Sequence, residues 1–222
     1  NGFDRGGRRL FGGAGLHRCV FTTTTGWGTA PFAGGACITF MTLGQTFKLI
    51  RSDLHARLKY EGRVPSITTM LGALLNPAAL ATCVWRFQVW IHRKRIPLIN
   101  KFLALGNMML FAAELEPEAE VEEGFLLLNP VGVMLHGHTK IGKNCVIAHQ
   151  ITTTLGPRVG FDPINDYIII GDNVVISAGV RIIGNLTIGS ETWVGPNTVV
   201  TETIPPNSLV LGKTVTAREA RP

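Results

Sequence analysis

The C-terminal half of the chain has an aliphatic residue at every sixth position. The run consists of Ile170, Ile176, Ile182, Ile188, Val194 and Val200, and Gly171, Gly189 and Gly195 directly follow three of them. A strand repeats every two residues, and six residues of an α-helix turn through about 600°, so neither keeps such a run on one face. A flat-sided solenoid does, if each six-residue unit is a short strand with a turn and three units close a triangular coil. We expect the aliphatic side chains to stack inside and the glycines to occupy corners where the backbone is tight or φ is positive.

The same lattice extends toward the N-terminus, with one shift and one interruption. Leu135, Ile141 and Ile147 continue it, and Val121 and Leu127 extend it out of phase by two residues. Between Ile147 and Ile170 the segment from Thr152 to Tyr167 breaks the period, and we expect it to loop out of the coil. Loops on a rigid scaffold often carry functional residues. A β-sandwich with apolar residues at this spacing by coincidence is the alternative fold.

Residues 43–113 show a helical pattern instead. Ile50, Leu54 and Leu58 recur at intervals of four with charged residues between them, which predicts an amphipathic helix. Asn76 and Pro77 read as an N-cap and a first helical residue. They open a second helix that runs toward Trp90 and His92. Pro97 separates that helix from a third.

These patterns divide the chain into four parts. Residues 1–40 are rich in Gly and Thr, have no period and are left unassigned, either as a disordered segment or as residues upstream of a natural start at Met41. Residues 41–115 form an α-helical region, 116–212 form the β-helix of hexapeptide repeats, and 213–222 form a C-terminal tail. The predicted fold class is therefore mainly β, a parallel β-helix preceded by helices.

Composition narrows the function only slightly. The net charge is +6 and the pI is near 9.5, but Lys and Arg are dispersed, which weakly favours a phosphate-bearing ligand and argues against a nucleic-acid partner. Cys19, Cys37, Cys83 and Cys145 form no CxxC pair, so we expect reduced thiols in a cytoplasmic protein.

The sequence also predicts no membrane span. The best apolar stretch, Phe102 to Ala113, is twelve residues long and contains Gly106 and Asn107, so we expect a buried or interfacial helix. Arg8 and Arg9 precede a Gly-rich stretch rather than an apolar one, which argues against an export signal.

From Ser52 to Lys213 the sequence resembles the serine O-acetyltransferase family of hexapeptide-repeat acyltransferases. The resemblance is carried by Ser52-Asp53-Leu54, Leu75-Asn76-Pro77, Glu116 to Val121, Asn129 to Val133, Lys140 to Cys145, Ile170 to Ile176 and Ile204 to Ser208. It implies a left-handed β-helix that uses acetyl-CoA as acyl donor and a small-molecule hydroxyl, L-serine of cysteine biosynthesis, as acceptor. It also implies a homotrimer or a dimer of trimers.

Two positions depart from the family pattern. The family uses a His as general base, and the matching position here is Asn129, preceded by Leu128 in place of an Asp or Pro. An amide does not accept a proton at neutral pH, so Asn129 is expected to orient the substrate or donate to an oxyanion. An Arg-His pair that would hold the serine carboxylate corresponds to Asp166-Tyr167.

Other residues are therefore candidates for the catalytic work. His136, His138 and His149 are the alternative bases, because imidazole titrates near neutral pH. The resemblance adds Asp53, at a family helix position, and Tyr167. For each of these residues, an ordinary surface or loop position is the alternative.

The donor site follows from the resemblance as well. In the family, CoA lies in a groove between adjacent β-helices, against backbone amides and small side chains near the repeat corners. The matching residues are Ala178, Gly179, Gly184, Pro196 and Lys213. Small residues allow a close approach and Lys meets a phosphate as a point charge, although turn requirements alone also explain the glycines.

Three other functions remain open at this stage. Loss of the carboxylate-binding Arg favours a sugar or polysaccharide hydroxyl as acceptor. Loss of both expected histidines favours a non-catalytic β-helix paralogue that binds a partner. A β-helix of the carbonic-anhydrase type would bind zinc through histidines. The histidine spacing does not fit such a site, and we expect no metal.

Overall fold

The computed structural model describes residues 41–156, 162, 166–212 and 214–217. Its helical part comprises α1 (Leu43–Tyr60), α2 (Ile67–Ala73), α3 (Pro77–Arg93) and α4 (Pro97–Phe111). The predictions for residues 1–40 and for Lys213 lie outside the described residues. The short helix α2 was not predicted. Its seven residues contain two Thr and a Gly, which are weak helix formers, and its capping box uses Thr69 instead of Glu or Gln.

The helix boundaries follow from local caps. Asn76 precedes α3, and its Oδ1 accepts hydrogen bonds from the N–H groups of Ala78 at 2.9 Å and Ala79 at 3.4 Å. Pro77 takes the first helical position, so the predicted start of this helix is confirmed. Pro97 likewise begins α4. Both prolines occupy a place where a helix needs no N–H donor.

The predicted amphipathic helix is also confirmed. Ile50, Leu54 and Leu58 of α1 are buried and form one apolar cluster with Ala73 and with residues of α3. Of the two expectations for α4, a buried or an interfacial helix, the structure excludes the buried one, because Asn107 is its only buried residue. It packs against α3 and leaves its apolar side chains exposed, so the stretch is not a buried helix.

No single described helix is long and apolar enough to cross a membrane. The helices α2 and α3 reach that threshold only when taken together, and they are bent by 89° at their junction.

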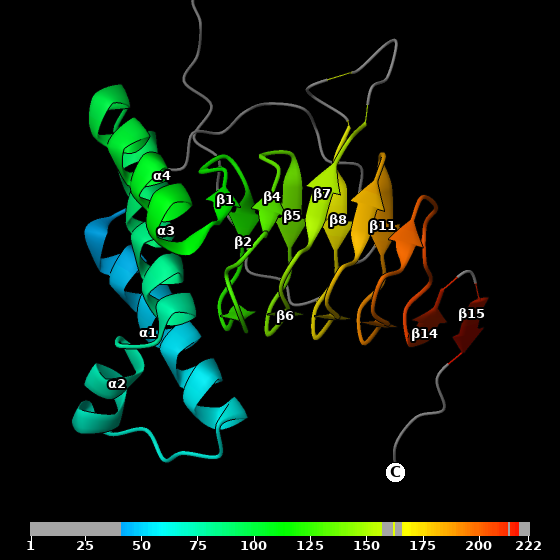
Figure 1. Cartoon of the computed structure of the whole chain (residues 1–222), viewed down its shortest axis with the longest axis horizontal. Coiled ribbons are helices and arrows are strands. Elements are labelled where there is room, and N and C mark those ends of the chain that lie inside the picture. The colour runs from blue at the N-terminus through cyan, green and yellow to red at the C-terminus, as the bar shows by residue number, and fades with distance from the viewer. Residues whose placement is uncertain (1–40, 157–161, 163–165, 213, 218–222) are drawn as a thin grey trace, which may run out of the picture. The chain divides into compact units, whose positions relative to one another are not determined.

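The rest of the described chain is a parallel β-helix with three sheets, whose strands stack as successive coils (Figure 1). Sheet A contains β1 (Glu114–Leu115), β4 (Met134–Leu135), β7 (Thr152–Thr154), β10 (Arg181–Ile183) and β13 (Val199–Val200). Sheet B contains β2 (Glu120–Val121), β5 (Thr139–Ile141), β8 (Ile168–Ile170) and β11 (Leu186–Ile188). Sheet C contains β3 (Leu126–Leu127), β6 (Val146–Ile147), β9 (Val175–Ile176), β12 (Trp193–Val194), β14 (Ser208–Leu211) and β15 (Thr214–Ala217). Only β14 and β15 pair antiparallel among these strands. These bounds differ from the prediction at both ends of the β-helix. The first strand begins at Glu114, two residues before the predicted start at 116, and β15 lies in the segment 213–222 that was predicted to be a tail.

The register explains the six-residue period. Ile170 pairs with Ile188 in sheet B, Ile176 with Val194 in sheet C, and Ile182 with Val200 in sheet A. All six side chains are at most 3% exposed. Each sixth residue therefore points inward from the next sheet, and side chains 18 residues apart stack on one another. The predicted solenoid is confirmed, with three internal columns.

One part of the predicted loop belongs to the coil instead. Thr152–Thr154 forms β7, and Thr153 takes an inward position with 1% exposure. Its Oγ1 lies 3.0 Å from Oγ1 of Thr139 and accepts the N–H of His136 at 2.9 Å. A buried hydroxyl that has hydrogen-bond partners can replace an aliphatic group with little loss of folding free energy. The six-residue pattern of aliphatic residues therefore does not detect this strand. The coil therefore includes Thr152–Thr154, and residues 157–161 and 163–165 of the predicted loop lie outside the described residues.

The repeat glycines are required for close packing rather than for positive φ. A Cβ at Gly189 would lie 2.3 Å from the N atom of Pro206, and one at Gly171 would lie 2.6 Å from the N atom of Ser190. Positive φ occurs at a different position of the same corner, for instance at Asn144 and Asn173. Asn tolerates this conformation better than most residues.

The helices cap the N-terminal end of the β-helix. Between coils, strand N–H groups donate forward, as Glu122 does to the carbonyl of Ile141 and Leu128 to that of Ile147. The equivalent carbonyls of the first coil, on Val121 and Leu127, have no coil before them. Guanidinium groups supply the missing donors, from Arg86 to Val121 at 2.7 Å and from Arg57 to Leu127 at 2.6 Å. Buried carbonyls need such partners, so the two parts stabilise one another.

Candidate functional site

Three edges run along the β-helix where consecutive sheets meet. We call the turns from sheet C to sheet A the C–A edge; they contain residues 128–133, 148–151, 177–180 and 195–198. The turns from sheet A to sheet B form the A–B edge, whose described residues are 116–119, 136–138, 155–156, 166–167 and 184–185. The predicted site residues divide between these two edges and the helices.

The C–A edge holds Asn129 and His149 at equivalent places. Leu127 pairs with Ile147, so each of the two residues follows the paired position by two. Neighbouring coils of a parallel sheet lie about 4.8 Å apart, which makes these side chains neighbours along the edge. Both residues are exposed. The structure thus brings one of the candidate bases, His149, beside Asn129.

Asn129 also has a local structural role. Its Oδ1 accepts the N–H of Val131 at 3.0 Å, which forms an Asx turn. The amide Nδ2 is a pure donor, so the side chain can offer two N–H groups to a ligand while its oxygen holds the turn.

Asn129 borders a pocket of about 420 Å³ between the helices and the first coil. The start of α3 contributes Asn76, the end of α4 contributes Met109, Leu110 and Phe111, and the turn contributes residues 128–131. None of its lining residues is charged. The pocket is therefore apolar, with amide side chains at Asn76 and Asn129, and has a size that suits a small molecule.

Three donor-site candidates continue along the same edge. Ala178 and Gly179 lie one coil beyond His149, and Pro196 lies one coil further. The N–H of Gly179 donates to the carbonyl of His149 at 3.1 Å. Gly179 has φ of +75°, and a Cβ there would lie 2.1 Å from Oδ1 of Asn197, so the turn alone requires glycine. The edge is nevertheless lined by small side chains that allow a ligand to approach the backbone.

The fourth donor candidate lies elsewhere. Gly184 belongs to the A–B edge, where it has φ of +109° and no atom near the place of a Cβ. The structure does not bring it together with Ala178, Gly179 and Pro196.

His136, His138 and Tyr167 form a separate group on the A–B edge. The ring centroids of His136 and His138 are 5.3 Å apart, and those of His138 and Tyr167 are 5.5 Å apart. Lys140 places its Nζ 4.2 Å from the Tyr167 ring centroid. Asp166, next to Tyr167, accepts a hydrogen bond from Nδ2 of Asn185 at 2.8 Å. In a single chain this group lies on a different edge from Asn129 and His149.

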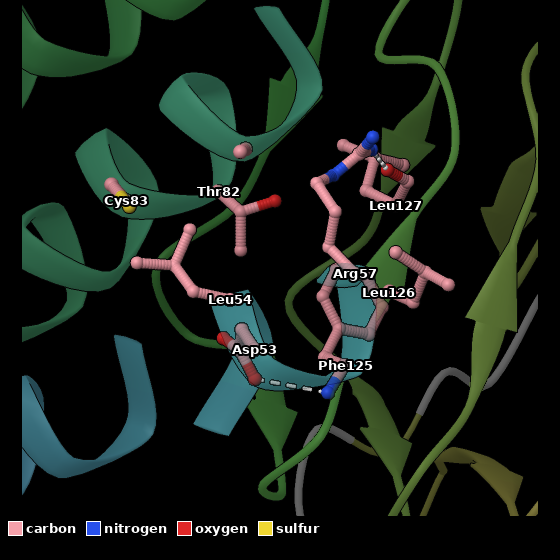
Figure 2. Close-up of a pocket in the computed structure, with 9 residues that line it drawn as sticks. Asp53, Leu54, Arg57, Thr82, Cys83, Phe125, Leu126 and Leu127 are labelled. Carbon is pink, nitrogen blue, oxygen red and sulfur yellow. Dashed lines mark hydrogen bonds between the residues drawn. The ribbon is translucent and has the colours of Figure 1, made fainter. Parts of the chain in front are cut away.

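Asp53 lies in neither edge but inside the contact between helices and first coil (Figure 2). Its side chain is 6% exposed and is ion-paired with Arg86 at 2.8 Å. Its Oδ1 also accepts the N–H of Phe125 at 2.9 Å, as the dashed line in Figure 2 shows. Burial raises the pKa of Asp53 above its ordinary value, while Arg86 and this N–H lower it. The neighbouring cavity measures only about 10 Å³, which is room for a water and no substrate.

Arg57 and Arg86, which join the helices to the coil, were not among the residues predicted from the sequence. A signal for Arg86 existed, because it is the only Lys or Arg between Pro77 and Ile91 in an otherwise apolar helix. A lone charge in such a setting is usually buried with a partner. Arg57 gave no such signal, since it lies among other charged residues of α1.

Among the described residues, no three His, Cys, Asp or Glu side chains converge where they could hold a metal ion. His136, His138 and His149 are the histidines that a zinc site of the carbonic-anhydrase type would draw on. The A–B edge brings together two of these, and His149 lies on the C–A edge.

Comparison with models of known protein families gives no match. Among curated proteins, serine acetyltransferase of Synechococcus elongatus is 28% identical over 167 residues, which cover 75% of this chain and 66% of the relative. The chain therefore spans just under two thirds of that relative's length. Serine acetyltransferase of Helicobacter pylori is also 28% identical, over 76% of this chain and 93% of the relative.

Solved structures give the same result for the fold. The structure of soybean serine acetyltransferase in complex with serine matches with a TM-score of 0.66 at 28% identity. The match covers 77% of this chain and 68% of the soybean chain. The Neisseria gonorrhoeae serine acetyltransferase has a TM-score of 0.71 at 24% identity, over 82% of this chain and 70% of that chain. The fold is the left-handed parallel β-helix with an α-helical N-terminal region, as expected. In its repeat, its fold and these relatives, the chain is similar to the serine O-acetyltransferases.

Proposed function

We propose that the chain is an acetyl-CoA-dependent O-acetyltransferase whose acceptor, by analogy with its relatives, is the hydroxyl of L-serine. The observation that carries the proposal is the C–A edge. It places Asn129, His149 and the small residues Ala178 and Gly179 in one row that begins at the pocket lined by Asn76 and Asn129. The acceptor occupies the pocket, and CoA extends along the row.

His149 is the general base in this proposal. It removes the proton of the acceptor hydroxyl as the oxygen attacks the thioester carbonyl carbon. The C–S bond then breaks, the thiolate of CoA leaves and takes the proton back, and the products are the acetyl ester and free CoA. His149 is chosen over His136 and His138 because it alone of the three lies on the edge that holds Asn129.

Asn129 stabilises the oxyanion that forms during the attack. Its Oδ1 is engaged by the N–H of Val131, so the Nδ2 amide is oriented as a donor. A donor aimed at developing negative charge is commonly worth two to three powers of ten in rate, roughly 3 kcal/mol or more.

The proposal includes a homotrimer or dimer of trimers in the cytoplasm. A groove between adjacent β-helices needs two walls, and a single chain supplies one. The A–B edge of a neighbouring copy, with His136, His138 and Tyr167, is available as the second wall. Sedimentation velocity of the purified chain measures the assembly directly.

A sugar hydroxyl is the second candidate acceptor. The pocket has no charged lining residue to pair with the ammonium or carboxylate of serine. The resemblance assigns a carboxylate-binding cation to the position of Asp166, but this residue is an acid. Its carboxylate accepts a hydrogen bond from Asn185. A neutral polyhydroxyl acceptor requires no ion pair and fits such a pocket.

Release of the CoA thiol tests these proposals, with acetyl-CoA as donor and L-serine or a panel of sugars as acceptors. We expect turnover with one acceptor class, and a fall in kcat of about 100-fold or more for His149→Ala. His55→Ala, a histidine on α1, is the matched control and should leave kcat unchanged. Turnover that survives His149→Ala would remove His149 as base. Absence of turnover with every acceptor would contradict both enzyme proposals and support a non-catalytic β-helix paralogue.

A further inference from the structure

The outward face of α4 is apolar. Leu98, Phe102, Leu105 and Met109 are 67%, 65%, 50% and 75% exposed. At 3.6 residues per turn these four side chains fall within an arc of about 60°. We call them the α4 stripe. A helix on a protein surface normally exposes polar residues here, so the stripe is an unusual surface.

The inward face of α4 is more polar than its outward face. Asn107 projects about 180° from the centre of the stripe, is 1% exposed and donates from Nδ2 to the carbonyl of Ala81 at 3.3 Å. Its amide fixes which side of α4 meets α3. The apolar side is therefore turned outward by a specific contact of the helix, and exposure of the stripe follows from this packing.

The surroundings of the stripe are basic. From Gly62 to Ala113 the chain contains no Asp or Glu, while it contains six Lys and Arg residues. Arg93, Lys94 and Arg95 directly precede α4, and Lys101 lies within it beside the stripe. Of these, Lys94, Arg95 and Lys101 are exposed and Arg93 is half-buried.

We propose that α4 lies flat on an anionic lipid bilayer, with the stripe in the boundary between headgroups and acyl chains and the basic residues against the headgroups. Helices that bind membrane surfaces combine an exposed apolar face that contains Phe and Leu with flanking Lys and Arg. Each basic residue near an anionic surface adds to the attraction between the helix and the bilayer. With 15 residues, α4 is suited to lying on a bilayer and is too short to cross one.

The charge pattern favours a bilayer over a contact between the α4 helices of two copies of the chain. If two α4 helices met through their stripes, the Lys101 side chains beside them would be brought toward like charges, with no acid on α4 to pair with. An anionic surface complements the same charges. The stripe also adjoins the pocket, because Met109 belongs to both. A bilayer bound there would lie beside the proposed acceptor site.

Vesicle flotation of the full chain tests the proposal without any assay of acetyl transfer. We expect binding to phosphatidylcholine vesicles that contain about 30% phosphatidylglycerol, and at least tenfold weaker binding to vesicles of phosphatidylcholine alone. The triple variant Arg93→Gln, Lys94→Gln, Arg95→Gln should lose at least tenfold in affinity for the anionic vesicles. Phe102→Ser combined with Met109→Ser should lose binding to a similar degree.

The controls separate membrane binding from folding and self-association. Leu211→Ser changes a side chain of similar exposure, 55%, on β14 and should bind as the parent does. Thermal unfolding followed by circular dichroism should be the same for all variants, because the substituted side chains are mostly exposed. The proposal is overturned if the parent chain does not float with anionic vesicles. It is also overturned if Phe102→Ser with Met109→Ser reduces the oligomeric state in lipid-free sedimentation, since the stripe would then join copies of the chain.

Discussion

The guanidinium of Arg86 donates two hydrogen bonds to the carboxylate of Asp53, from Nε at 2.8 Å and from Nη2 at 3.2 Å. Both side chains are nearly inaccessible to solvent, with 3% and 6% exposure. The same guanidinium donates to the carbonyls of Val121 and Glu122, and the carboxylate accepts from the N–H of Phe125. One ion pair therefore joins α1, α3 and the first coil of the β-helix.

Asp53→Asn should destabilise the fold by about 2–4 kcal/mol, because it leaves a buried guanidinium without its counter-charge. Urea denaturation gives the free energy of unfolding. The control is Glu120→Gln, which removes an acid whose side chain is 58% exposed and pairs with Lys140 at 3.6 Å. Such an exposed pair contributes at most about 1 kcal/mol. Equal losses for the two variants would contradict the structural role of Asp53.

Arg57→Met should destabilise the junction mainly by removing hydrogen bonds to the coil, and it also removes the ion pair of Arg57 with Glu61 at 3.2 Å. Its guanidinium donates to the carbonyl of Leu127 at 2.6 Å, and Met fills a similar volume without a donor. A buried carbonyl left without a partner costs about 1–3 kcal/mol. Arg63→Met, at an arginine whose side chain is 49% exposed, should change the free energy of unfolding by less than about 0.5 kcal/mol. If both variants unfold at the same urea concentration, Arg57 does not cap the coil.

The β-helix was predictable from sequence because its core uses one chemical type of residue at one interval. Ile182 and Val200 satisfy that rule and stack as expected. Thr153 occupies the equivalent inward place with a hydroxyl that finds Thr139 across the core, and a hydrophobic pattern does not detect such a pair. The period therefore located the coils but placed the start of the loop too early.

The junction and the site were less predictable for a different reason. Arg86 and Asp53 are 33 residues apart, and their pairing depends on how α1 and α3 pack. The turn after Leu127 is longer than the equivalent turn after Ile147. Asn129 and His149 are therefore recognised as neighbours only when the pairing of Leu127 with Ile147 is known. Residue types in the sequence indicate candidate site residues, but only the tertiary structure shows which of these residues lie next to one another.

Gly189→Ala and Gly106→Ala should have opposite effects on stability. A Cβ at Gly189 would lie 2.3 Å from backbone of the next coil, so the coils must separate locally. We expect a loss of about 2 kcal/mol or more. At Gly106, in α4, no atom lies within 4 Å of the new Cβ and φ is not positive. Ala should stabilise the fold there by about 0.5–1 kcal/mol through helix propensity. Melting temperatures that fall for both variants would contradict the described packing of one of the two sites.

The buried thiols predict a loss of stability at alkaline pH. Burial raises the pKa of Cys83 from 9.0 to about 11 and that of Cys145 to about 12. At neutral pH, about two units below the ordinary thiol pKa of 9.0, both states keep their thiol protons, and these groups add no pH dependence there. Between pH 9 and 11 the unfolded chain binds fewer protons than the folded one, so the free energy of unfolding falls, by at most about 1.4 kcal/mol per pH unit for each thiol.

Cys83→Ala isolates this contribution. The variant should show a shallower decline of the free energy of unfolding between pH 9 and 10.5 than the parent, measured by urea titration at each pH. Its stability at pH 7 is the reference for any packing loss, which does not depend on pH. Parallel declines in parent and variant would show that the thiol of Cys83 ionises as readily in the folded chain as in the unfolded one.

Substitutions at Asn129 separate its structural role from its proposed chemical role. Asn129→Asp keeps an oxygen for the N–H of Val131 and so keeps the Asx turn, but it replaces the donor Nδ2 with a negatively charged oxygen. We expect the melting temperature to stay within about 2 °C of the parent while kcat falls by about 100-fold, because a carboxylate repels a developing oxyanion. Asn129→Ala loses the turn and the donor, so it should lower both. If Asn129→Asp retains full turnover, the residue shapes only the turn, and the oxyanion is stabilised by another donor.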